Sequence, residues 1–254
     1  MKKCMMKDNA LGYGNIKMLG LVGIYIIALV LGILFRIYGG SAGILLSGMV
    51  FYVLPLTWTL IKMKTEKIPF QLWTAKVNKS TWYDSFFVAI FFIGISVAFI
   101  LIEAMLFKEG QIEYVKVSWQ KIIVLAALAP ITEELICRGL ILQSFVNKYP
   151  IKKAVWLSAI IFYVIHLNIF NILAIFVGLM FAVLMIRHCN IYMTMAIHFF
   201  WNLILQLKPL LINLLHNVSS NVCLYMLMVC FIMIIVGVIK SIQQYTFIVK
   251  EYCE

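Results

Sequence analysis

The feature that most constrains this chain is a set of long apolar runs, one of which contains charges. Residues 127–146 read ALAPITEELICRGLILQSFV, a stretch long enough to cross a bilayer with Glu133, Glu134 and Arg138 near its middle. A charged side chain at the centre of a spanning helix costs roughly 2.5 to 3.5 kcal/mol on insertion scales. We therefore interpret these three charges as functional and look for the groups that pair with them or solvate them.

The composition predicts an all-α, polytopic membrane protein. Of the 254 residues 64% are hydrophobic and 12% are charged, whereas soluble domains have roughly 25% charged residues. In lipid, such long apolar segments satisfy their backbone polar groups as helices. We expect residues 1–254 to form a single integral membrane domain, a helical bundle with about eight transmembrane helices. The predicted spans are 18–37, 43–61, 85–107, 118–146, 154–170, 172–187, 191–215 and 222–242.

The basic residues lie in alternate connections. With the N-terminus inside, fifteen of the 21 Lys and Arg residues fall on the inner side, five fall outside and Arg138 stays within the membrane. The positive-inside rule then favours cytoplasmic N- and C-termini. Anionic headgroups account for the net charge of +11, and no basic stripe with interleaved aromatics predicts a nucleic-acid partner.

The longest connection, residues 62–84, alternates lysines with Ile68, Trp73 and other large apolar side chains. It is interpreted either as a segment lying along the inner membrane interface or as an irregular loop with a few anchoring aromatics. In the third segment Glu103 lies near the outer end, and we expect it to reach the surface.

The spacing within residues 133–138 separates the two glutamates. Adjacent helical residues point about 100° apart, whereas an acid and a base four residues apart meet on one face. We therefore expect Glu134 to pair with Arg138 and Glu133 to face a cavity. Pro130 removes the helical donor for the carbonyl of Ala126 and predicts a kink with room for water.

The strongly polar residues of the next segments lie at a comparable depth. His166 ends the sequence FYVIH, and His198 and Asn202 share one face of HFFWN. Because very short turns separate these segments, their helices must be antiparallel neighbours. A carboxylate and an imidazole facing a trapped water form a general-base arrangement, and further donors would stabilise an oxyanion. The chemistry indicated is amide hydrolysis by activated water, without an acyl-enzyme.

Three short motifs follow one another on these hydrophobic segments. They are Glu133-Glu134-x-x-x-Arg138, Phe162-x-x-x-His166 and His198-x-x-x-Asn202. In this order they resemble the motifs of the type II CAAX protease and bacteriocin-processing (CPBP) family, also called the Abi family of intramembrane proteases. The resemblance covers residues 118–215, the expected catalytic core, and the first three segments carry no signature.

This resemblance implies an eight-helix membrane fold with an active site reached from the cytoplasmic side. It also implies that Glu133 and His166 activate water, while His198 and Asn202 stabilise the tetrahedral intermediate. The sequence has no H-E-x-x-H, but the carboxylate of Glu133 and the imidazoles of His166 and His198 are the ligand types of zinc, so a zinc cofactor stays open.

Other interpretations fit the same residues. A catalytically silent membrane regulator or bacteriocin-immunity protein would keep the fold and bind a partner, and a cation-coupled transporter would use the buried acids, although no inverted repeat is visible. The charges could also fix helix register, with Asn202 as an interhelical contact. For a protease, we expect hydrophobic or lipidated peptides or membrane-protein segments as substrates, contact with membrane lipids, and a bacterial plasma membrane as the location.

Overall fold

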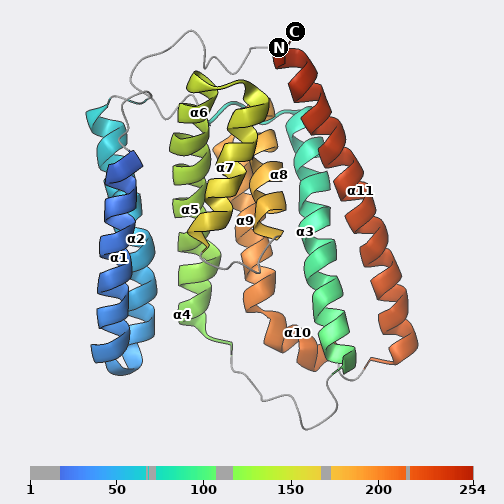
Figure 1. Cartoon of the computed structure of the whole chain (residues 1–254). Coiled ribbons are helices and arrows are strands. Elements are labelled where there is room, and N and C mark those ends of the chain that lie inside the picture. The colour runs from blue at the N-terminus through green and yellow to red at the C-terminus, as the bar shows by residue number, and fades with distance from the viewer. Residues whose placement is uncertain are drawn as a thin grey trace.

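The computed structural model describes residues 18–66, 68, 73–106, 117–166, 173–215 and 218–253, and its regular elements in these ranges are helices (Figure 1). The predicted all-α class is confirmed for this part of the chain. The helices stand side by side in one bundle. At one edge α1 (Met18–Tyr38) pairs with α2 (Gly43–Thr65) through the short η2 (Gly40–Ala42), and at the other α3 (Lys79–Leu106) pairs with α11 (Ser220–Cys253).

The middle of the bundle carries the three motifs. Residues 119–148 are helical without a break, although the winding changes along them: α4 (Trp119–Lys121), the π-helical η4 (Ile122–Leu128), α5 (Ala129–Glu134), the π-helical η5 (Leu135–Ile141) and α6 (Leu142–Lys148). This run is followed by α7 (Ile151–Ile165), α8 (Leu173–His188), α9 (Ile191–Gln206) and α10 (Lys208–Leu215).

All eight predicted segments contain helix, but they differ in length. Within the described ranges α1, α2, α3 and α11 are long and apolar enough to cross a membrane, and α9 with α10 gives a fifth candidate, bent by 55°. Helices α7 and α8 have 15 and 16 residues, or about 23 Å, less than a hydrocarbon core of about 30 Å. The count of eight spans and the cytoplasmic termini therefore stay predictions.

Several boundaries differ from those expected. The predicted fifth segment ends as a helix at Ile165, with His166 as its C-cap, and residues 167–170 lie outside the described part of the chain. The predicted seventh segment is broken before Lys208. Hydropathy reveals neither the helix end at Ile165 nor the break before Lys208, because the sequence stays apolar beyond both points.

One end of the bundle is closed by the connection between α2 and α3. We call it the basic end, because Lys62, Lys64, Lys148, Lys152, Lys153 and Arg187 lie there. Trp73 is fully buried and packs so closely on Gly139 that a Cβ at this glycine would lie 2.6 Å from the indole. The side chain of Asn190 donates to the carbonyl of Ala75 at 2.6 Å. The expected interfacial position is wrong for Trp73 and Ile68, because both pack into the protein core.

Buried or half-buried ion pairs fix α3 at both of its ends. Near its start, Asp84 Oδ2 accepts from Arg187 Nε at 2.7 Å and lies 2.8 Å from His188 Nε2, which joins α3 to α8. Near its other end, Glu103 pairs with Lys208 at 2.8 Å. Both side chains of this pair are partly exposed, so the expectation that Glu103 reaches the surface stays a prediction, and the pair also ties α3 to α10.

Candidate active site

Two adjacent glutamates on α5 face different surroundings, as the helical geometry predicted. Glu134 Oε1 lies 3.2 Å from Arg138 Nη1, and both side chains are fully buried. Glu133 lines a pocket of about 350 Å³. Glu133 is therefore available to a substrate, whereas Glu134 is held in the interior of the bundle by its ion pair.

The guanidinium of Arg138 is held on several sides. Its Nη2 donates to the carbonyl of Gly178 at 3.4 Å, and its Cζ lies 4.2 Å from the ring centroid of Phe162 and 5.3 Å from that of Phe181. A carboxylate, a carbonyl and two aromatic faces together offset the desolvation of a buried cation. Arg138 thus joins the glutamate helix to both α7 and α8.

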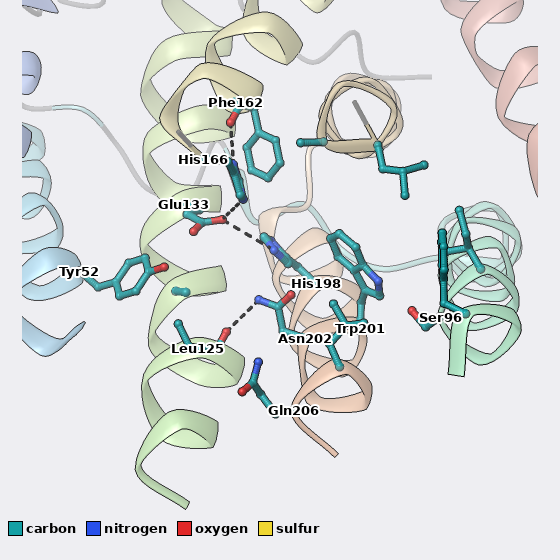
Figure 2. A pocket seen from close by; sticks show the side chains of 16 residues that line it. Tyr52, Ser96, Leu125, Glu133, Phe162, His166, His198, Trp201, Asn202 and Gln206 are labelled. Carbon is teal, nitrogen blue, oxygen red and sulfur yellow. Dashed lines mark hydrogen bonds and ion pairs between the residues drawn. The ribbon is translucent and has the colours of Figure 1, made fainter. Parts of the chain in front are cut away.

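Two imidazoles converge on the pocket-facing carboxylate (Figure 2). His166 Nε2 lies 3.6 Å from Glu133 Oε2, and His198 Nε2 lies 3.7 Å from the same oxygen. No described side chain donates a hydrogen bond to that oxygen. These separations are longer than a direct hydrogen bond. The structure therefore brings Glu133, His166 and His198 together in the wall of the pocket.

The second nitrogen of each ring is occupied by an acceptor, which fixes the tautomer. His166 Nδ1 donates to the carbonyl of Phe162 at 2.7 Å, and His198 Nδ1 donates to Glu134 Oε1 at 3.0 Å. Because a carbonyl and an ion-paired carboxylate only accept, each Nδ1 carries a hydrogen. Each Nε2 is thereby turned toward Glu133. Glu134 orients a ring of the site in addition to pairing with Arg138.

Asn202 contacts the helix that carries the glutamates through a backbone group. Its Nδ2 donates to the carbonyl of Leu125 at 2.8 Å. Leu125 lies in π-helical η4, where Ala129 N–H donates to Val124 O, five residues back. In this winding the donor for Leu125 would be Pro130, which has no N–H. The predicted unpaired carbonyl at Ala126 is thus corrected to Leu125, and Asn202 satisfies it.

The pocket includes a residue that the sequence did not single out. Tyr52 of α2 lines it and points toward the Glu133 carboxylate (Figure 2). Tyr52 is remote in sequence from the motifs, so no spacing rule could connect them. The only sequence signal that Tyr52 belongs to the site was its polar ring in the middle of the second apolar segment. The other walls come from α3 and from Trp201, Leu205 and Gln206 of α9.

The histidines and the glutamate were also considered as zinc ligands. Among the described residues, no group of three His, Cys, Asp or Glu side chains is arranged so that it could hold a metal ion. The possible zinc site at Glu133, His166 and His198 is not among such groups, and a zinc cofactor stays a prediction. We derive no step through a metal.

Comparison with known families agrees with the resemblance of the three motifs. Residues 116–204 match the model of the family described as type II CAAX prenyl endopeptidase Rce1-like. The match contains all three motifs and begins just before α4. No curated protein and no solved structure matches the chain. The apolar helices and the family match indicate an integral membrane protein that is similar to CAAX-type proteases over residues 116–204.

Proposed function

We propose that this membrane protein is an intramembrane endopeptidase that hydrolyses a peptide bond with water held by Glu133 and His166. The observation that carries the proposal is the approach of both imidazole Nε2 atoms to Oε2 of Glu133, a carboxylate oxygen that accepts no hydrogen bond from a described side chain. In this proposal residues 118–215 form the catalytic core of an eight-span bundle with cytoplasmic termini.

The first step is attack by water on the substrate carbonyl. A water molecule between Glu133 Oε2 and His166 Nε2 would donate its hydrogens to these two acceptors, which leaves an oxygen lone pair for the carbonyl carbon. As the new C–O bond forms, Glu133 takes the proton of the water. His166 is held in place for this role by the carbonyl of Phe162, 2.7 Å from Nδ1.

The second step is collapse of the tetrahedral intermediate. Its oxyanion would accept hydrogen bonds from Nε2–H of His198 in its doubly protonated form and from the second N–H of the Asn202 amide. The C–N bond then breaks, and the proton held by Glu133 and His166 passes to the departing amine. The products are a carboxylate and an amine, so no covalent enzyme intermediate is needed.

Two contacts support the assignment of His198 and Asn202 to the oxyanion. Glu134 accepts from Nδ1 of His198 and so directs Nε2 into the pocket. The carbonyl of Leu125 takes one Asn202 N–H and leaves the other one free to turn toward the substrate. Both donors are therefore positioned before a substrate arrives, as electrostatic stabilisation of a transition state requires.

The test is cleavage of a prenylated CAAX-type reporter peptide by the purified full chain in lipid vesicles. We expect Glu133→Gln, His166→Ala and His198→Ala each to reduce cleavage by about 10²- to 10⁴-fold, the usual contribution of general acid–base groups. Glu66→Gln is the matched control, because Glu66 pairs with Lys62 at the basic end, away from the pocket.

The control variant should cleave at the rate of the unsubstituted chain. Each variant must also elute as a folded, monodisperse protein before its activity is compared. Full activity in Glu133→Gln would refute the proposal, because Glu133 is the only carboxylate among the described residues that line the pocket.

A further inference from the structure

Tyr52 lies in the middle of α2, a helix that carries none of the three motifs. The buried residues Pro55 and Thr59 follow it at intervals of three and four residues, so Tyr52 shares the face of α2 that is turned toward the protein interior. The carbonyl of Tyr52 lies 3.4 Å from Oγ1 of the buried Thr132, the residue before Glu133. The depth of Tyr52 in the bundle is thus matched to that of the Glu133 carboxylate.

The carboxylate of Glu133 is approached from two sides (Figure 2). His166 and His198 lie on one side, with their Nε2 atoms 3.6 and 3.7 Å from Oε2. Tyr52 reaches the carboxylate from the other side, and its hydroxyl points at it within hydrogen-bonding reach. All four side chains line the same pocket. The carboxylate therefore lies between a phenol and two imidazoles.

The hydroxyl of Tyr52 serves the oxygen that the histidines leave. Oε2 of Glu133 is buried and has no hydrogen-bond partner among the described residues, so the hydroxyl is directed at Oε1. A phenol is a donor as well as an acceptor, whereas an ionised carboxylate only accepts. The hydrogen of the hydroxyl therefore points at Oε1.

We infer that Tyr52 is a positioning residue, whose phenol donates to Oε1 of Glu133 and so turns Oε2 toward the two imidazoles. The last torsion of a glutamate side chain is broad, so a carboxylate without such a contact can rotate. A hydrogen bond to an ionised group is roughly twice as strong as one between neutral groups. Oε2 stays free for the water. This inference deepens the proposed function and rests on it for the reaction, whereas the contact itself rests on the fold.

The ring of Tyr52 is held by aromatic neighbours. Phe51 meets it edge-on, with the ring centroids 5.3 Å apart, and the ring of Tyr25 on α1 lies 5.7 Å from that of Phe51. These contacts involve the rings and not the hydroxyl of Tyr52. Tyr52→Phe therefore keeps the packing of α2 and removes only the donor to Glu133.

The first test requires no cleavage and uses infrared difference spectroscopy of the full chain in lipid vesicles. The carboxyl band of Glu133 is identified as the one that disappears in Glu133→Gln. We expect this band to shift in Tyr52→Phe, because Oε1 loses its donor. The matched control is Tyr225→Phe, which removes the same hydroxyl from an exposed position on α11 and should leave the band unchanged.

The second test is cleavage of the prenylated reporter peptide. Tyr52→Phe should lower kcat by about 10- to 100-fold, the scale of loss when a catalytic group is slightly misplaced. KM should stay within about twofold, because the ring that lines the pocket remains and only an interaction needed in the transition state is lost. Tyr225→Phe should cleave at the rate of the unsubstituted chain. A merely structural role of Tyr52 would lower the yield of folded protein without separating kcat from KM.

Three results would overturn the inference. An unchanged Glu133 band in Tyr52→Phe would exclude the contact. A shifted band with an unchanged kcat would exclude the positioning role, and a raised KM with an unchanged kcat would show that Tyr52 only binds the substrate. If the band shifts as expected but the unsubstituted chain cleaves no reporter, the proposed function fails and the contact stands.

Discussion

The two neighbouring glutamates should respond in opposite ways to the same conservative substitution. Glu134→Gln removes the charge that pairs with Arg138 at 3.2 Å, in a place where both side chains are fully buried. Glu133→Gln removes a carboxylate whose Oε2 is buried and accepts no hydrogen bond from a described side chain. The first change leaves an unpaired cation inside the bundle, whereas the second relieves an unfavourable burial.

The magnitude follows from the burial of the pair. Removing one partner of a buried ion pair costs about 3 to 5 kcal/mol. In Glu134→Gln the carbonyl of Gly178 and the rings over Arg138 stay in place, and cation–π contacts of about 2 kcal/mol offset part of the loss. We expect a net destabilisation of about 1 to 3 kcal/mol for Glu134→Gln, and a smaller change for Glu133→Gln, because Oε2 of Glu133 accepts no hydrogen bond from a described side chain.

The assay is thermal unfolding of both purified variants and the unsubstituted chain in one detergent, followed by loss of the monodisperse species. Glu134→Gln should melt several degrees lower, and Glu133→Gln should melt with the unsubstituted protein while losing its cleavage activity. Equal destabilisation of the two variants would refute this division of roles. So would an unchanged melting temperature in Glu134→Gln.

Two further predictions concern packing and the oxyanion site. Asn202→Ala should reduce cleavage by about 10²- to 10³-fold, as loss of an oxyanion donor does. It should also lower stability by about 1 to 3 kcal/mol, because the carbonyl of Leu125 loses its donor. A cleavage rate within twofold of the unsubstituted chain would exclude the oxyanion role. Gly178→Ala should destabilise by about 1 to 3 kcal/mol, since its Cβ would lie 2.8 Å from Cα of Ala159, whereas the control Gly23→Ala meets nothing within 4 Å and should be neutral or slightly stabilising. Equal melting temperatures for these two glycine variants would contradict the close packing of α7 on α8.

The parts of the site that depend on local spacing could be predicted from the sequence. The four-residue interval between Glu134 and Arg138 fixes their contact on any helix, and the short turns place His166 and His198 beside the glutamates. The parts that depend on hydrogen-bond register or on distant packing could not. The π winding of η4 moves the unpaired carbonyl from Ala126 to Leu125.

Distant packing accounts for the remaining differences. Tyr52 reaches the site only through the packing of α2 against the middle of the bundle. The end of α7 was misplaced, and the break between α9 and α10 was missed, because the apolar sequence continues past both points. Asp84, which pairs with Arg187, was assigned to a connection because the sequence does not reveal that α3 begins at Lys79.

The shortness of α7 and α8 bears on how a hydrolytic reaction is supplied inside an oily layer. Two helices of about 23 Å cannot match a hydrocarbon thickness of about 30 Å, and a membrane adapts to such a mismatch by thinning locally. At the depth where α7 ends, the pocket continues with Gln206 in its lining, and a locally thinner membrane would shorten the path of a water molecule to it. Short helices at this depth would thus bring water, the second reactant of the proposed hydrolysis, within reach of Glu133.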